Sequence, residues 1–238
     1  MKIYSSEICP FVQRVTALLE ARNLPYEIEN IDLGDKPDWF LEISPLGQVP
    51  VLVADDGRAL HESDAIVEYI EETAGEPLFP GDPVEKAQER AWSYLATKNY
   101  LVQCSAQRSP DRVTFVERAT KLKKAFAAVE KRLGDSQFFS GDKVGMVDIA
   151  WLPLLHRAAI IQQHSGYDFL AEFPKVKAWQ QAICATGLPE KSVAEDFVEK
   201  FTNFYLSSKT YLGQQLTSET EQVCCGPSGH SVTRACCC

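Results

Sequence analysis

The sequence predicts a two-domain protein, in which a small α/β domain comes first and an all-helical domain follows. Three observations support this fold class. Strand and helix patterns alternate up to about residue 73, a segment dense in proline and glycine follows at 76–83, and only helical spacing occurs from there to about residue 206. A chain of 238 residues is long enough for two such units, each with its own core.

The first domain is predicted to have the order β-α-β-loop-β-β-α. Residues 26–33 alternate between apolar and polar types, as in a strand, and apolar residues recur at helical spacing in 11–24. The expected strands are 1–6, 26–33, 49–53 and 59–60, the helices are 11–24 and 63–73, and the loop is 44–48. This order gives a small mixed sheet covered by helices.

The second domain shows helical patterns only. They cover residues 84–107, 111–133, 147–164, 174–185 and 190–206. We therefore divide the chain into an α/β domain at 1–77, a linker at 78–84, a helical domain at 85–212 and a tail at 213–238. The tail is rich in Gln, Ser, Thr and Gly with little periodicity, and we expect it to be disordered.

The composition excludes several classes of protein. The net charge of −9 argues against a nucleic-acid partner, because neutralising phosphates requires a basic surface. No run of about 18 uncharged apolar residues occurs, so we expect no membrane span. The start of the chain lacks the apolar stretch of a signal peptide. Five of the eight cysteines crowd the last fifteen residues, which is not how a disulfide framework is distributed, and we expect a reduced, cytoplasmic protein.

Cys9 is the candidate reactive thiol. It precedes Pro10, a favoured first helical residue, at the start of the predicted helix. A helix N-terminus lowers the pKa of a cysteine, and Arg14 is expected to add positive potential. Val12 stands where a dithiol enzyme has its second cysteine, so a mixed disulfide at Cys9 has to be resolved by an external thiol such as glutathione. The alternative is a buried cysteine that only packs.

Val49-Pro50 and His61-Glu62-Ser63-Asp64 are candidate ligand sites. A cis bond before Pro50 would let an extended peptide pair with the backbone of Val49, whereas a trans proline on an edge strand is the common alternative. Ser63 is a suitable N-cap for the following helix, and the free N–H groups there would bind a carboxylate. Glu62 would accept an ammonium group. Simple helix capping is the alternative interpretation.

Taken together, these segments resemble cytosolic glutathione transferases, most closely the omega-like, cysteine-type branch. The resemblance covers about residues 1–206 and depends on ICPFVQRV, DKPDWFLEISPLGQVPVL, HESDAIVEYIEE, LFPGDPVEKA and GMVDIAW. It implies a thioredoxin-like first domain, an all-helical second domain and a homodimer. It also implies glutathione as co-substrate, with no obligatory metal at the transferase site.

The resemblance implies a role for each candidate residue. Cys9 would form a mixed disulfide with glutathione, and Val49 would pair with the glutathione backbone before a cis Pro50. Glu62 and Ser63 would hold the γ-glutamyl end, and Lys36 would face the glycine carboxylate. The implied reactions are thiol transfer, deglutathionylation and dehydroascorbate reduction. The family's helix-capping box is incomplete, because Asp148 is present but Gly145 holds the cap position.

An acceptor pocket is expected between the domains. Phe11 could line it, together with the helical face formed by Phe197, Phe201 and Phe204. The alternative is that this face belongs to the ordinary core.

The C-terminal sequence CCGPSGHSVTRACCC suggests a second type of site. Soft thiolates bind Cu(I), Zn(II) and thiophilic metalloids, although the spacing is not that of a zinc finger. The candidate ligands are Cys224, Cys225, His230, Cys236, Cys237 and Cys238. A glutathione-linked metal- or metalloid-binding protein is therefore one alternative function. A non-enzymatic protein similar to the chloride intracellular channel proteins, which share the fold and the Cys-Pro-Phe helix start, is another.

Overall fold

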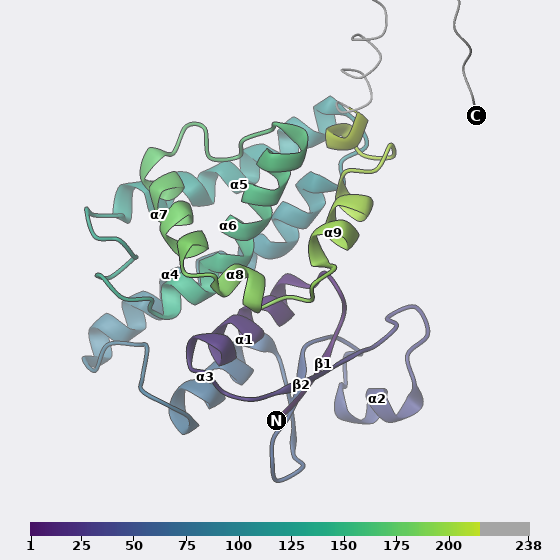
Figure 1. The fold of residues 1–238 in the computed structure, drawn as a ribbon, viewed down its shortest axis with the longest axis vertical. Helices are drawn as coiled ribbons and strands as arrows, with labels where there is room; N and C mark the ends of the chain where they lie inside the picture. The colour runs from purple at the N-terminus through teal and green to yellow at the C-terminus, as the bar shows by residue number, and fades with distance from the viewer. Residues whose placement is uncertain (215–238) are drawn as a thin grey trace, which may run out of the picture.

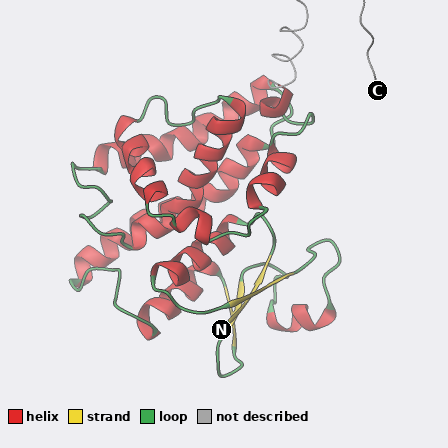
Figure 2. Cartoon of the chain, viewed as in Figure 1, coloured by secondary structure: helices red, strands yellow, loops and turns green. Residues whose placement is uncertain are grey.

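The computed structural model describes residues 1–214 as a small mixed α/β part joined to a larger helical part (Figure 1). The first part contains β1 (Lys2–Ser5), α1 (Pro10–Ala21), β2 (Glu27–Asn30), α2 (Asp38–Ile43), β3 (Val51–Val53), β4 (Ala59–His61) and α3 (Ser63–Thr73). Its sheet has the order β2-β1-β3-β4, in which β1 is parallel to β2 and antiparallel to β3 (Figure 2). The predicted fold class is confirmed.

Helices cover both faces of this sheet. Ile3 and Leu52 point toward α1 and α3, where they are fully buried. A smaller apolar cluster of Ile31, Phe40 and Val51 lies under α2 on the other face. Helix α2 was not predicted from the sequence, because it has only six residues, too few to show a helical period, and begins after Pro37.

Strand β2 forms one edge of the sheet. All four of its residues are exposed, including Ile28 at 47%. Along the strand, Ile28 stands between Glu27 and Glu29. Glu29 forms an ion pair with Lys2 at 2.7 Å. The strand is shorter than predicted, because residues beyond Asn30 leave the sheet for the α2 loop.

The helical part is built around α6 (Met146–Ser165). This helix is buried on almost every side and packs against α4 (Pro83–Gln107), α1 and α7 (Pro174–Ala185). Helix α5 (Arg112–Arg132) packs beside α4. Within residues 1–214, no helix combines the length and the apolar character that a membrane span requires.

The helix predicted at 190–206 is two helices. Helix α8 (Leu188–Lys191) ends before Ser192, and α9 (Phe197–Tyr205) begins after a bend. Ser192 is held by α1, because its carbonyl accepts a hydrogen bond from the Thr16 hydroxyl at 2.7 Å and its hydroxyl accepts one from Gln13 at 3.2 Å. These contacts replace the helical bonds that would continue α8.

A buried ion pair joins the ends of α1 and α3 where the chain leaves the first part. The Arg22 guanidinium contacts the Glu71 carboxylate, and both side chains are almost completely buried. Glu71 also accepts hydrogen bonds from the backbone N–H groups of Leu78 and Phe79 at 2.9 Å. The connection to α4 is therefore held against the first part before the helical part begins.

Candidate active site

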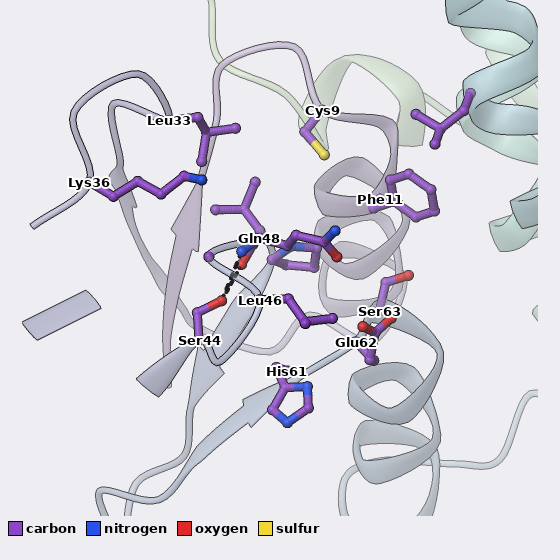
Figure 3. A pocket seen from close by; sticks show the side chains of 14 residues that line it. Cys9, Phe11, Leu33, Lys36, Ser44, Leu46, Gln48, His61, Glu62 and Ser63 are labelled. Carbon is purple, nitrogen blue, oxygen red and sulfur yellow. Dashed lines mark hydrogen bonds between the residues drawn. The ribbon is translucent and has the colours of Figure 1, made fainter. Parts of the chain in front are cut away.

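A cavity of about 450 Å³ opens between the first part and α4. Figure 3 shows side chains from the start of α1, the loops around α2 and the start of α3 around this cavity. Its lining residues are Cys9, Phe11, Leu33, Lys36, Ser44, Leu46, Gly47, Gln48, Val49, Pro50, His61, Glu62, Ser63 and Leu101. The six side chains assigned above to the thiol and to glutathione all lie here.

Cys9 is the N-cap residue of α1, and Pro10 is the first helical residue. The backbone N–H groups of Phe11 and Val12 lower the pKa of the half-buried thiol, as the sequence analysis expects. Burial has the larger effect, however, and the net pKa of Cys9 is raised above its ordinary value. The expected net lowering is therefore wrong for this structure.

Arg14 does not add the positive potential expected at the thiol. Its buried guanidinium forms an ion pair with Asp64, the second residue of α3. This pair joins the starts of α1 and α3, and it neutralises Arg14 locally.

The Val49–Pro50 peptide bond is cis. Both residues line the cavity, and the backbone N–H and carbonyl of Val49 have no hydrogen-bond partner within residues 1–214. The preceding loop is rigidly held, because the Ser44 hydroxyl accepts from the Gln48 N–H at 2.9 Å and donates to the Gln48 carbonyl at 2.8 Å (Figure 3). Val49 thus offers an open peptide edge on a fixed loop.

Helix α3 begins at the cavity wall without a side-chain cap. Ser63, predicted as the N-cap, is the first helical residue, and Glu62 is the N-cap. Glu62 has φ +69°, a left-handed conformation that costs a residue with a Cβ on the order of 1 kcal/mol or more. The first N–H groups of α3 therefore have no partner within residues 1–214, and with the Ser63 hydroxyl beside them they suit an anion.

Lys36 comes from the loop before α2 and lies across the cavity from this helix start (Figure 3). Its ammonium group has no carboxylate within ion-pair distance among residues 1–214. The cavity therefore has a cation at one end, an uncapped helix start that suits an anion at the other, and the Cys9 thiol on its wall.

The comparisons with known proteins agree with this geometry. Residues 3–78 match the model of the glutathione S-transferase N-terminal domain, and residues 111–182 match that of the C-terminal domain. Glutathione S-transferase omega-1 of Rattus norvegicus is 34% identical over 189 residues, which cover 77% of this chain and 76% of the rat protein. The chain belongs to the glutathione S-transferase family.

Further relatives refine this assignment. The probable cytosolic glutathione S-transferase DHAR1 of Oryza sativa is 31% identical over 74% of this chain and 79% of its own. The crystal structure of rice GST1 in complex with glutathione superimposes with a TM-score of 0.74 at 24% identity, covering 85% of this chain and 95% of that one. The resemblance to omega-class members is confirmed, and this glutathione S-transferase is a glutathione-dependent enzyme.

The three phenylalanines of α9 lie outside the large cavity. Phe197 and Phe201 are buried, and Phe197 stacks on His156 at 5.5 Å between ring centres. Phe204 is 46% exposed and lies beneath Arg108. Phe11 does line the cavity, where its ring contacts Tyr100, and Leu101 joins it from α4. This wall of the cavity is therefore formed by α1 and α4, whereas Phe197 lines a smaller neighbouring cavity that also contains Cys9.

Arg157 of α6 is a residue near the site that the sequence analysis missed. Its guanidinium is completely buried and donates to the carbonyl of Ile8, the residue before Cys9, at 3.2 Å. A signal was present, because residues 146–161 are apolar on nearly all faces, which leaves no solvent-exposed face for an arginine.

The tail predictions lie outside the described residues. They concern Cys224, Cys225, His230, Cys236, Cys237 and Cys238, all beyond residue 214.

Proposed function

We propose that this glutathione S-transferase carries out glutathione-dependent thiol transfer through a mixed disulfide at Cys9. One observation carries the proposal. Cys9 lies at an uncapped helix start in the same cavity as the open Val49 backbone and the uncapped start of α3, and Val12 replaces a second thiol. A cysteine in this place forms a disulfide with glutathione more readily than it activates glutathione for conjugation.

Glutathione fits the cavity as an extended peptide with a charged group at each end. Val49 would pair with the backbone of its cysteine residue, as a short added strand. The N–H groups and hydroxyl at Ser63 would bind the γ-glutamyl carboxylate, and Glu62 would accept its ammonium. Lys36 would pair with the glycine carboxylate. This pose leaves the glutathione sulfur near Cys9, with Phe11 and Leu101 on the acceptor side.

The exchange has two balanced steps. The Cys9 thiolate attacks the glutathione sulfur of a glutathionylated substrate, the substrate leaves as a thiolate, and Cys9 becomes disulfide-bonded to glutathione. A second glutathione thiolate then attacks the bound glutathione sulfur, oxidised glutathione leaves, and the Cys9 thiolate is regenerated. Dehydroascorbate reduction uses the same overall couple, two glutathione molecules being oxidised for each ascorbate formed. The relative named DHAR1 supports including this acceptor.

The testing experiment compares the wild type with Cys9→Ser in the glutathione-dependent reduction of a model mixed disulfide. We expect a loss of at least about a hundredfold in kcat, because serine cannot form the disulfide, while glutathione binding measured by calorimetry is retained. Full activity of Cys9→Ser would contradict the proposal and favour instead one of the hydroxyl groups just before it in the chain, those of Tyr4, Ser5 and Ser6. We also propose that the protein is a cytoplasmic homodimer. Sedimentation of the purified protein tests its dimeric state.

A further inference from the structure

Arg157 is a buried cation without an anionic partner among residues 1–214. Its guanidinium donates to the Gln13 side-chain oxygen, to the Pro153 carbonyl at 3.1 Å and to the Ile8 carbonyl at 3.2 Å. All three acceptors are neutral. The group lies over the rings of Phe197 and Phe201, at 5.3 and 6.0 Å from their centres, and its Nε has no partner within the described part of the chain.

The other two buried arginines show how unusual this is. Arg14 is paired with Asp64, and Arg22 with Glu71. A buried charge is costly unless an opposite charge accompanies it, and burial accordingly lowers the pKa of Arg157. An anion that forms during function would supply the opposite charge that this guanidinium lacks.

The acidic groups around Arg157 are two thiols and two phenols. They are Cys9 from the start of α1, Tyr100 and Cys104 from α4, and Tyr205 from α9. Burial raises the pKa of both tyrosines, so neither phenol is a ready source of an anion. Cys104 faces Tyr205, whereas Cys9 lines the cavity. Cys9 is therefore the thiol that both faces Arg157 and meets a substrate.

Among residues 1–214, the buried cation that faces Cys9 is Arg157. From α1, Cys9 is faced by the N–H groups of Phe11 and Val12, from α4 by Cys104 and Tyr100, and from α6 by Arg157. The ionisable side chains of the large cavity beside Cys9 are Lys36, His61 and Glu62. A smaller neighbouring cavity, which Cys9 also lines, contains Glu7 and Lys200. Glu7 and Lys200 are paired with each other.

We propose that Arg157 is a positioning residue of the thiol-transfer reaction, and that its buried guanidinium supplies the counter-charge of the Cys9 thiolate. This inference rests on the proposed function. Cys9 acts as a thiolate twice, as the nucleophile that attacks the substrate disulfide and as the leaving group that glutathione displaces. A fixed positive charge behind the sulfur favours both steps. Arg157 has no exposed surface, so it acts through Cys9 and touches no substrate.

The first test follows the alkylation of each cysteine by iodoacetamide as a function of pH, using the full chain and mass spectrometry of separate peptides. In Arg157→Met we expect the Cys9 midpoint to rise by about one pH unit, which lowers its alkylation rate about tenfold below the midpoint. Arg157→Lys keeps the charge and should show less than half of this shift. Cys184, half-buried on α7, is the internal reference and should not change.

An unchanged Cys9 midpoint in a folded Arg157→Met protein would overturn the inference, as would a shift in Arg157→Lys as large as in Arg157→Met. A purely structural role would alter folding without this charge dependence. The measurement needs neither glutathione nor turnover. The inference about Arg157 can therefore be wrong while the proposed function is right. The proposed function is decided separately, by whether the wild type reduces a mixed disulfide.

A second test leaves Arg157 in place. Cys9→Asp and Cys9→Asn differ by a charge at the same N-cap, and the two residue types cap helices about equally well. Asp82 is a matched control, because it is also an N-cap residue followed by a proline, at the exposed start of α4. At each position we divide the folding equilibrium constant of the protein with aspartate by that of the protein with asparagine. We expect this ratio to be about tenfold larger at position 9 than at position 82. A ratio no larger than that at position 82 would overturn the inference.

Discussion

The two helices that begin at the cavity start differently from α4, α5 and α7 of the helical part. In the first part, α1 and α3 start at Cys9 and Glu62 with no hydrogen bond from a side-chain cap, and both starts line the cavity. In the helical part, Asp82 accepts from the Val84 and Glu85 N–H groups at 2.9 Å. Asp111 caps α5 in the same way, and Glu130 of α5 accepts from the first N–H groups of α7.

This difference shows what a binding site costs the fold. A cap on α3 would fill the place where a ligand carboxylate is proposed to bind. Leaving a helix uncapped forgoes about 1 kcal/mol, and the left-handed backbone of Glu62 adds a similar cost. The C-terminal end of α3 is held by Arg22, which donates to the carbonyls of Ile70 and Ala74 and pairs with Glu71. We call this the closed end of α3, and the uncapped start at the cavity its open end. We infer that the closed end of α3 holds the open end in place.

The largest change in stability is expected when the ion pair at the closed end of α3 is broken. Glu71→Gln removes the charge that faces Arg22 and leaves the guanidinium buried and unpaired. We expect the free energy of unfolding to fall by about 3 to 5 kcal/mol, measured by urea denaturation. A loss below about 1 kcal/mol would show that α3 does not depend on this pair.

We expect acid to destabilise the helical part through His156. Burial and the neighbouring Arg157 lower the pKa of this histidine to about 3, so it is neutral in the folded protein. The unfolded chain binds the proton near pH 6.5, and stability is therefore lost as the pH falls from about 6.5 toward 3. By pH 5 the loss from this group is about 2 kcal/mol.

The replacement His156→Gln removes this titration and keeps an acceptor for Gln13, which contacts the ring at 2.8 Å. The difference in unfolding free energy between variant and wild type should shrink steadily between pH 7 and pH 5. Parallel stability curves would mean that His156 is not the acid-sensitive group.

A matched pair of alanine variants compares the two kinds of helix start directly. Ser63→Ala should raise the KM for glutathione about tenfold with little loss of stability, because it removes a hydroxyl proposed to bind a charged group. Asp82→Ala should lower the unfolding free energy by about 1 kcal/mol and leave that KM unchanged. If Ser63→Ala proved destabilising with KM unaltered, the start of α3 would be an ordinary structural feature.

The smallest effect is expected at α6, where a cap can be added. The Gly145 N–H donates to the Asp148 carboxylate at 2.8 Å, but glycine offers no return acceptor. A Cβ at Gly145 would lie 3.6 Å from its nearest neighbours, at φ −114°, so serine fits. Gly145→Ser should raise the unfolding free energy by roughly 0.5 to 1 kcal/mol, seen as a higher melting temperature. A lower melting temperature would contradict this reading of the cap.

Local patterns predict the elements that local physics fixes. The helix expected at 63–73 has those bounds in α3, and the helices at 84–107 and 174–185 agree with α4 and α7 within one residue. The helix at 190–206 is wrong because Ser192 is held by Thr16 and Gln13 on α1, a contact between distant segments. Propensity alone does not contain that information.

The same limit applies to the site. Cys9, Val49 and Ser63 were predicted because each marks the start of a helix or strand, which is visible in the sequence. The cation beside the thiol was assigned to Arg14, a near neighbour along the chain, but that charge is neutralised by Asp64. Arg157 lies 148 positions after Cys9 and meets it only through the packing of α1 on α6. Its distance in sequence hides its relation to the thiol.

The exposed edge of the sheet has a consequence for how this enzyme meets other proteins. An edge strand presents unpaired backbone groups, to which an unfolded segment can add as a further strand and so seed aggregation. Strand β2 carries Glu27 and Glu29 in this exposed row, beside an exposed Ile28. These carboxylates repel acidic segments and are costly to bury beneath an added strand. We expect them to keep this edge from seeding aggregation when unfolded segments meet the enzyme.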